Sequence, residues 1–249
     1  MARTVLVTGA TSGFGLVVAR RWAARGDRVI AVGRRAERLE ALAAELATVR
    51  AVPLDVTDLP AVDFALASLE GEWAEIDLLV NSAGMALGLA KAWEADWADF
   101  ATMISTNCTA LAYLTHRVLP GMVARRRGQI VNLGSVAAHV PYVGGNVYGA
   151  TKAFVAQLSA NLRADLVGTG VRVTLVEIAA AETEFSLVRF KGDAARAASV
   201  YQGFRPISAE EVGDAILWAC DQPPHVDVAR IELYPTAQAA GGMMFDRSG

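Results

Sequence analysis

The sequence predicts an α/β protein with a doubly wound, seven-stranded parallel sheet and helices on both faces. Short β-branched runs alternate with longer segments of helical periodicity, which is typical of parallel sheets. Runs such as Val5-Leu6-Val7 are apolar without alternation, as expected for strands that are buried on both faces. A glycine-rich segment follows the first run and precedes a helical pattern.

The expected elements follow from these runs and from the segments between them, most of which are long enough for a crossover helix. The catalytic-region helix is expected from Tyr148 to about Val167. Residues 180–207 are polar and irregular, and we expect an excursion over the site with one short helix at Asp193–Gln202. No linker precedes it, so residues 1–249 are expected to form a single domain. The expected strands are Thr4–Thr8, Arg28–Gly33, Arg50–Asp55, Ile76–Asn81, Gln129–Gly134, Val171–Ile178 and Ala229–Tyr234.

Composition excludes several classes of protein. Of the 249 residues, 53% are hydrophobic and 20% are charged, unlike a disordered chain. The net charge of −3 offers no broad positive field for nucleic acid. The longest uncharged stretch, residues 128–151, is broken by glycines and polar residues and is no membrane span.

A few residues bear on the location of the protein in the cell and on whether it binds a metal. The first strand begins almost at Met1, which leaves no room for a signal peptide. Cys108 and Cys220 are expected to be reduced thiols. The histidines are scattered without ligand spacing, so no metal site is expected. We therefore expect a cytoplasmic protein that acts on a small molecule, without nucleic acid or membrane as a partner.

The glycine-rich segment runs from Thr8 to Gly15. Its glycines permit a tight turn, a close backbone approach and close packing of helix on strand. The following helix N-terminus offers free N–H groups to a pyrophosphate. A glycine cluster alone is weak evidence, but its place after the first strand of a βαβ unit indicates a dinucleotide site of the Rossmann type. The cofactor-binding residues expected here are Gly9, Thr11, Ser12, Gly13, Phe14 and Gly15.

The end of the second strand indicates which nicotinamide cofactor is bound. An acidic residue there binds the ribose 2′-hydroxyl of NAD, whereas arginine accommodates the 2′-phosphate of NADP. This chain has Arg34 and Arg35, with Arg38 one turn on. Surface arginines at a helix start are the alternative, but cations are unfavourable at a helix N-terminus. We therefore predict NADP.

Tyr148 and Lys152 have the i, i+4 spacing that places them on one helix face. A free tyrosine titrates near pH ~10, and a cation one turn away is expected to lower its pKa. Tyr148 can then exchange a proton with a carbonyl or alcohol during hydride transfer. Ser135 ends the fifth strand, where its hydroxyl can hold the substrate oxygen. Asn107 interrupts a helical pattern with a mediocre helix former.

In this order, Thr-Gly-x-x-x-Gly-x-Gly, Asn-x-Ala-Gly, Asn107, Ser135 and Tyr148/Lys152 resemble the short-chain dehydrogenases/reductases over essentially the whole chain. The resemblance implies that Asp55 contacts the adenine amino group, with a helix N-cap as the alternative role, and that Asn107 kinks its helix and holds a water in a proton relay. It departs at Ser82, where the family has a second asparagine. The further cofactor residues that it implies are Val56, Asn81, Ala83, Gly84, Tyr148, Lys152, Ile178 and Thr183.

Residues 119–123, 144–155 and 183–193 are similar to bacterial NADP-dependent 3-hydroxy acid dehydrogenases. Members of that branch oxidise serine-like 3-hydroxy acids, reduce malonic semialdehyde and form tetramers. A carboxylate substrate needs a cation, and Arg189 is the candidate. A homotetramer is also suggested by the apolar tail, residues 239–245. The expected substrate residues are Ser135, His139, Tyr142, Asn146 and Arg189.

The sequence departs from the family beside the pocket, where Ile178 and Ala179 replace Pro and Gly. These replacements add or move bulk. They favour an alternative, reduction of bulkier neutral or aromatic ketones, whether by natural drift or engineering. A third alternative is a non-catalytic NADP-binding module, which typically loses the tyrosine or the lysine that this chain keeps.

Overall fold

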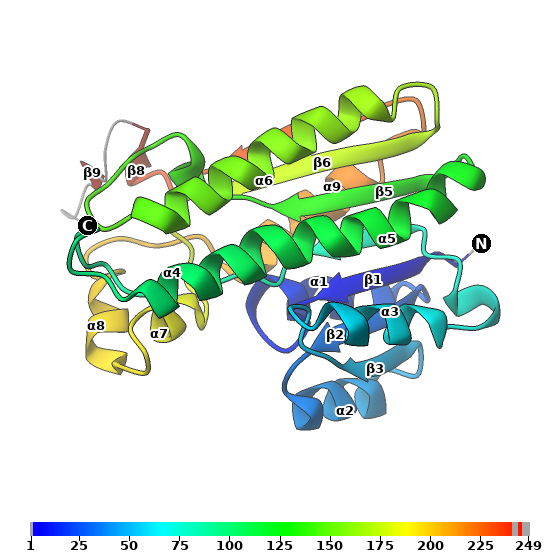
Figure 1. Cartoon of the computed structure of the whole chain (residues 1–249), viewed down its shortest axis with the longest axis horizontal. Helices are drawn as coiled ribbons and strands as arrows, with labels where there is room; N and C mark the ends of the chain where they lie inside the picture. The colour runs from blue at the N-terminus through cyan, green and yellow to red at the C-terminus, as the bar shows by residue number, and fades with distance from the viewer. Residues whose placement is uncertain (1, 241–243, 246–249) are drawn as a thin grey trace.

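The computed structural model describes residues 2–240, 244 and 245, and its central feature is a parallel seven-stranded sheet between two layers of helices (Figure 1). The strand order is β3-β2-β1-β4-β5-β6-β7, and each neighbouring pair is parallel. The strands are β1 (Thr4–Thr8), β2 (Arg28–Gly33), β3 (Val49–Pro53), β4 (Leu78–Asn81), β5 (Gly128–Leu133), β6 (Val171–Ile178) and β7 (Arg230–Leu233).

Both faces of the sheet are buried, which explains the apolar runs without alternation. In β1, Val5 and Val7 pack on the same side as Trp22, whereas Leu6 packs with Met122 on the other. Figure 1 shows α5 and α6 running side by side along one face. One layer holds α1 (Gly13–Ala24), α2 (Ala36–Glu45) and α9 (Ala209–Cys220), and the other holds α3 (Leu59–Ala67), α5 (Leu111–Ala124) and α6 (Asn146–Asp165).

Shorter elements surround the carboxyl ends of the strands. A π-helical turn, η2 (Ser105–Ala110), joins α4 (Trp97–Ile104) to α5. The expected excursion at 180–207 contains α7 (Phe185–Arg189) and α8 (Ala194–Ser199). The remaining elements are the 3₁₀ turns η1 (Gly71–Trp73) and η3 (Val136–Ala138) and the small antiparallel pair β8 (Gln238–Ala239) and β9 (Met244–Phe245).

The sheet order reverses between β1 and β4, because β2 and β3 extend to one side and β5 to β7 to the other. Ligands of doubly wound sheets bind in the crevice at the carboxyl ends of the strands beside such a reversal. The predicted fold class is confirmed. No helix in the described part of the chain has the length and hydropathy needed to span a bilayer.

The bounds predicted for β1, β2 and β6 are confirmed, and the others differ by one or two residues. The third strand ends at Pro53, so Asp55 follows the strand instead of closing it. The helix that carries Tyr148 begins at Asn146. The short helix predicted at 193–202 spans Ala194–Ser199, with Asp193 as its cap, and α7 was not predicted.

Candidate active site

A cavity of about 410 Å3 lies at the carboxyl ends of β1, β4, β5 and β6. Its wall includes the glycine-rich turn after β1, the loop after β4 and residues of the 180–207 excursion. Of the residues predicted to form the site, the following line it: Gly9, Thr11, Ser12, Gly13, Phe14, Arg34, Arg35, Asp55, Val56, Ala83, Gly84, Ser135, Tyr142, Tyr148, Lys152, Ile178, Thr183 and Arg189.

The turn after β1 has the geometry that its glycines predict. Gly9 and Gly13 have φ angles of +69° and +50°, which favour glycine. A Cβ on Gly15 would lie 2.5 Å from Gly9 O, so Gly15 permits close packing of α1 without itself lining the cavity. Ser12 precedes α1 but makes no side-chain cap, which leaves the helix N-terminus available to an anion.

Three arginines follow β2, and the structure gives them different surroundings. Arg35 donates to Thr11 Oγ1 and to Ser12 Oγ, each over 2.8 Å, and to Glu184 Oε2 over 2.7 Å. Arg38 donates to Glu184 Oε1 over 2.7 Å and does not line the cavity. These hydrogen bonds, from Arg35 and then Arg38, lower the pKa of Glu184. Arg38 thus reaches the cofactor corner only through Glu184 and Thr11 O, and its contact with the cofactor stays a prediction.

Arg34 lies at the cavity mouth, with Nη1 3.9 Å from Asp55 Oδ2. Asp55 Oδ1 accepts hydrogen bonds from the backbone N–H and the hydroxyl of Thr57. Asp58, not Asp55, caps α3, since its side chain accepts from Ala61 N. The N-cap alternative for Asp55 is thus wrong, and its carboxylate remains at the cavity.

The expectation that Asn81 lies beside the cofactor is also corrected. Its side chain is buried behind the cavity wall, where Nδ2 donates to Thr115 Oγ1 and to Asn132 Oδ1, both over 2.9 Å. The amide joins the end of β4 to β5 and α5 instead of facing the cavity. Ser82, where the sequence departs from the family pattern, does line the cavity.

Ser135, Tyr148 and Lys152 come together at one end of the cavity. Ser135 is separated from the end of β5 by Gly134 alone and caps the turn η3, and its hydroxyl donates to Ile178 O over 3.2 Å. Tyr148 is buried and lines the cavity together with Ser135. Lys152 lies one helical turn on, where Nζ donates to Leu133 O over 2.8 Å and is 5.9 Å from the Tyr148 ring centre.

Burial dominates the electrostatics of this group. It raises the pKa of Tyr148 to about 12, although the neighbouring Ser135 hydroxyl and the charge of Arg189 act in the opposite direction. Burial also lowers the pKa of Lys152 to about 8. The predicted effect of Lys152 on the pKa of Tyr148 stays a prediction, because burial dominates the shift in this structure.

Asn107 lies within the π-helical turn η2, so the kink that the family resemblance implies is present. Its Oδ1 accepts from Met85 N over 2.9 Å, and its Nδ2 donates to Met85 O and Thr151 Oγ1. Asn107 does not line the cavity. A Cβ on Gly84 would lie 3.3 Å from Asn107 Oδ1 and 3.6 Å from Lys152 Nζ, so Asn107 and Lys152 approach the same wall.

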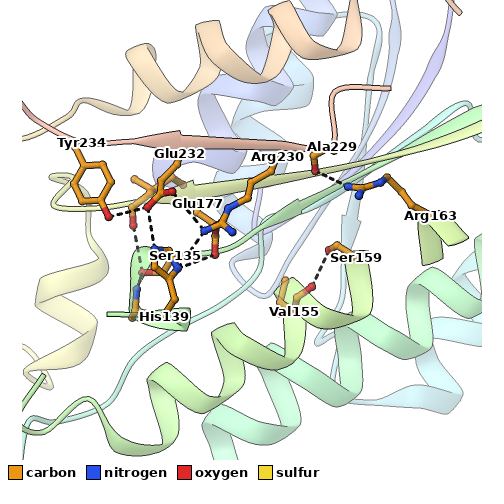
Figure 2. Close-up of polar contacts among 12 residues, drawn as sticks. Ser135, His139, Val155, Ser159, Arg163, Glu177, Ala229, Arg230, Glu232 and Tyr234 are labelled. Carbon is orange, nitrogen blue, oxygen red and sulfur yellow. Dashed lines mark hydrogen bonds and ion pairs between the residues drawn. The ribbon is translucent and has the colours of Figure 1, made fainter. Parts of the chain in front are cut away.

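Two of the predicted substrate residues lie outside the cavity. His139 points toward β7, where Nε2 is 3.0 Å from Glu232 Oε1 (Figure 2). Asn146 donates from Nδ2 to Ala90 O over 3.0 Å and helps to hold the start of α6. Both assignments to the substrate site are corrected, because the polar atoms of these side chains are engaged elsewhere.

Arg189 does enter the cavity. Its guanidinium carbon lies 5.2 Å from the ring centre of Tyr148 and 5.4 Å from that of Phe185, and Nη2 donates to Tyr142 Oη over 2.5 Å. No described carboxylate forms an ion pair with it, and its buried Nε has no described hydrogen-bond partner. A cation held among aromatic rings with unused donors is suited to an anionic ligand.

Comparisons with known proteins agree with this arrangement. A family model described as short chain dehydrogenase matches residues 3–192. The chain belongs to the short-chain dehydrogenase family.

Its relatives include the NADP-dependent 3-hydroxy acid dehydrogenase YdfG of Salmonella typhi, which is 50% identical over 98% of this chain and 99% of the relative. Serine 3-dehydrogenase of Agrobacterium fabrum is 48% identical over 99% of each chain. Among solved structures, the closed form of serine dehydrogenase complexed with NADP+ superimposes with a TM-score of 0.94 at 50% identity, over 96% of this chain and 97% of that one.

Several cavity residues of this short-chain dehydrogenase were not predicted. Gln238 lines the cavity, and its Oε1 accepts from Ala180 N over 2.9 Å. Tyr201 donates to Ala181 O over 2.9 Å and also lines it. Glu184 was predicted only as part of residues 183–193, the stretch similar to the 3-hydroxy acid dehydrogenases, and not as a residue of the site. Some of these contacts join segments that are far apart in the sequence, and others lie within an irregular loop. In neither case does a local sequence pattern predict them.

The low pKa of Lys152 predicts a pH dependence of stability. A lysine that titrates near 8 when folded and near 10.5 when unfolded makes the unfolded chain bind more protons in between. The free energy of unfolding of the wild type should therefore rise relative to that of Lys152→Met between about pH 8 and 10, by up to ~1.4 kcal/mol per pH unit. Denaturant titrations at each pH measure this difference.

Lys191→Met is the matched control. The ion pair with Asp99 raises the pKa of this exposed lysine. The difference in free energy of unfolding between the wild type and Lys191→Met should therefore not change with pH over the same range. Parallel curves for the wild type and Lys152→Met would contradict the low pKa of the buried amine.

Proposed function

We propose that this chain is an NADP-dependent oxidoreductase that moves a hydride between NADP(H) and a 3-hydroxy acid or its carbonyl counterpart. The observation that carries the proposal is the position of Arg189, which lies in the same cavity as Ser135, Tyr148 and Lys152 without a described carboxylate partner. The relatives named above, which include an NADP-dependent 3-hydroxy acid dehydrogenase and a serine 3-dehydrogenase, support it.

The residues present fit an NADP molecule. The open N-terminus of α1 suits the pyrophosphate, because its backbone N–H groups and dipole favour an anion. Arg34 and Arg35, with the hydroxyls of Thr11 and Ser12, form a basic, hydroxyl-rich corner at the end of β2 that suits the 2′-phosphate. The bound nicotinamide supplies the position that accepts or gives the hydride.

The protein supplies the proton transfer. Ser135 holds the hydroxyl of the alcohol by a hydrogen bond, and Tyr148 takes its proton as the carbonyl forms. In reduction, Tyr148 returns the proton to the oxygen. The ammonium of Lys152, whose Nζ lies 5.9 Å from the ring centre of Tyr148, stabilises the phenolate in either direction. Asn107 fixes the backbone near Met85 and links it to Thr151, beside Lys152.

Arg189 and Tyr142 bind the substrate carboxylate in this proposal, at the side of the cavity where Tyr148 presents its ring. Bulkier neutral ketones are the competing substrates. Ile178 and Ala179 do lie in the cavity wall, as expected from the sequence, and they give it an apolar surface beside Ser135.

The homotetramer and the cytoplasmic location expected from the sequence stay proposals. Large apolar side chains on α4 and α6, among them Trp97 and Phe154, are exposed and support an assembly. Residues 241–243 of the apolar tail at 239–245 lie outside the described residues, and the side chains of Met244 and Phe245 are not described.

Tyr148→Phe tests the proton transfer. The variant removes the hydroxyl but leaves the ring against Phe185. We expect kcat to fall by roughly 10²–10⁴-fold, the usual value of general acid–base catalysis, with NADPH affinity unchanged. Steady-state kinetics and NADPH fluorescence titration measure the two effects. More than half of the wild-type rate in the variant would rule out this role.

The cofactor assignment predicts a selective loss. Replacing Arg34 and Arg35 together by leucine should raise the KM for NADPH at least about tenfold, because charge-assisted hydrogen bonds contribute roughly 1.5–3 kcal/mol. The KM for NADH should change little. Arg38→Leu is the matched control, since it also breaks a pair with Glu184 but does not line the cavity. Equal losses with both cofactors would contradict the assignment.

The substrate assignment predicts that charge decides turnover. With NADP+, 3-hydroxypropanoate should be oxidised with a kcat/KM at least about tenfold above that of 3-hydroxypropanamide, and Arg189→Met should remove this preference. An aryl ketone with NADPH tests the competing substrate class. A wild-type enzyme that reduces the ketone and does not distinguish the acid from its amide would overturn the 3-hydroxy acid proposal.

A further inference from the structure

Glu177 is a buried carboxylate beneath the loop that carries Ser135. It lies on β6, next to the last residue of the strand, and is 0% exposed. A Cβ on Gly134 would lie 2.8 Å from Glu177 Cγ, so the side chain packs against the backbone directly before Ser135. A buried carboxylate is unfavourable unless opposite charges or hydrogen bonds surround it.

The charges around Glu177 come from two other segments. Arg230, on the edge strand β7, forms an ion pair from Nε to Glu177 Oε2. His139, just after η3, places Nδ1 3.8 Å from Glu177 Oε1. Burial raises the pKa of Glu177, while the charges of Arg230 and His139 oppose this effect and that of Glu232 adds to it. Figure 2 shows the group gathered behind Ser135.

A second set of contacts fixes His139 to β7. Glu232 Oε1 lies 3.0 Å from His139 Nε2 and accepts from Tyr234 Oη over 2.7 Å. Arg230 Nη2 lies 3.2 Å from His139 Nδ1 and 3.4 Å from Glu232 Oε2. The imidazole is thereby held between the two strands and the turn η3.

The loop from Gly134 to His139 is consequently tied at both ends. Gly134 N donates to Val176 O over 2.8 Å at its start, and His139 is held by β7 at its end. Ser135 lies between these points, and its hydroxyl donates to Ile178 O, the residue after Glu177. Any shift of β6 or β7 relative to this loop therefore moves the Ser135 hydroxyl.

We propose that Glu177, Arg230 and His139 are positioning residues that set the direction of the Ser135 hydroxyl by clamping its loop to β6 and β7. The inference rests on the proposed function, in which Ser135 holds the substrate oxygen. None of the three lines the cavity, so they act through the loop backbone and not by contact with substrate. The proposal gives the half-exposed partners of the buried Glu177 a role beyond strand pairing.

Glu177→Gln tests the proposal with little change of shape. We expect kcat to fall by roughly tenfold, because small displacements of a catalytic group cost up to ~10²-fold in rate. The KM values for NADPH and NADH should not change, since the residues of the phosphate corner lie elsewhere. Repeating the substitution in a Ser135→Ala background should cause no further loss, because no hydroxyl remains to be positioned.

Two companion variants separate positioning from folding. Arg230→Met leaves Glu177 buried without its main counter-charge and should lower the unfolding midpoint. Adding Glu177→Gln should restore the midpoint but leave kcat low. Asp227→Asn is the matched control, because Asp227 pairs with Arg163 and accepts from Val173 N at the opposite end of β6 and should affect stability alone.

The outcomes distinguish the two proposals. A Ser135→Ala enzyme with a rate near that of the wild type would overturn the proposed function and this inference with it. A low Ser135→Ala rate, combined with the same fractional loss from Glu177→Gln in both backgrounds, would overturn the inference alone. A wild-type kcat for Glu177→Gln, or for the double variant with Arg230→Met, would do the same.

Discussion

Thr8 Oγ1 accepts hydrogen bonds from the backbone N–H groups of Ser82 and Ala83, over 3.1 and 3.0 Å, and so holds the turn after β1 against the loop after β4. The contact is close enough that a Cβ on Gly9 would meet Ala83 N at 3.0 Å. Gly15 brings α1 down onto the same turn. This backbone packing sets the crevice width at the reversal of strand order, and every other part of the cavity is arranged around it.

The charged side chains that line the cavity differ in their position and surroundings. The cations that line it are Arg34, Arg35, Lys152 and Arg189, and only Asp55 and Glu184 oppose them among the lining carboxylates. Arg34 is exposed, Arg35 and Arg189 are half-buried, and Lys152 is buried. Arg34 and Arg35 lie beside the glycine-rich turn, and Arg189 lies against the ring of Tyr148. This separation suits a cofactor phosphate at one end and a small anion at the other.

The sequence was sufficient for the sheet and for the parts of the site that lie on it. Strand runs buried on both faces are apolar throughout, and the glycines at 9 and 13 carry their positive φ angles as expected. The errors lie in side-chain direction. His139 and Asn81 come from the right segments but point into β7 and α5, and Gln238 reaches the cavity from far along the chain. Such directions depend on tertiary contacts that no local pattern records.

The phenol of Tyr148 and the ammonium of Lys152 depend on only two elements. Tyr148 and Lys152 share one face of α6, and the Lys152 amine is fixed by Leu133 O, at the end of the strand that leads to Ser135. The relative positions of phenol and ammonium are therefore set by the packing of α6 on β5, whereas the Ser135 hydroxyl also depends on its contact with Ile178 O at the end of β6. The 180–207 segment adds Phe185 and Arg189 against the Tyr148 ring. Because rigid elements hold the chemistry and an irregular segment supplies Arg189, substrate choice can vary on this fold while the proton-transfer geometry is retained.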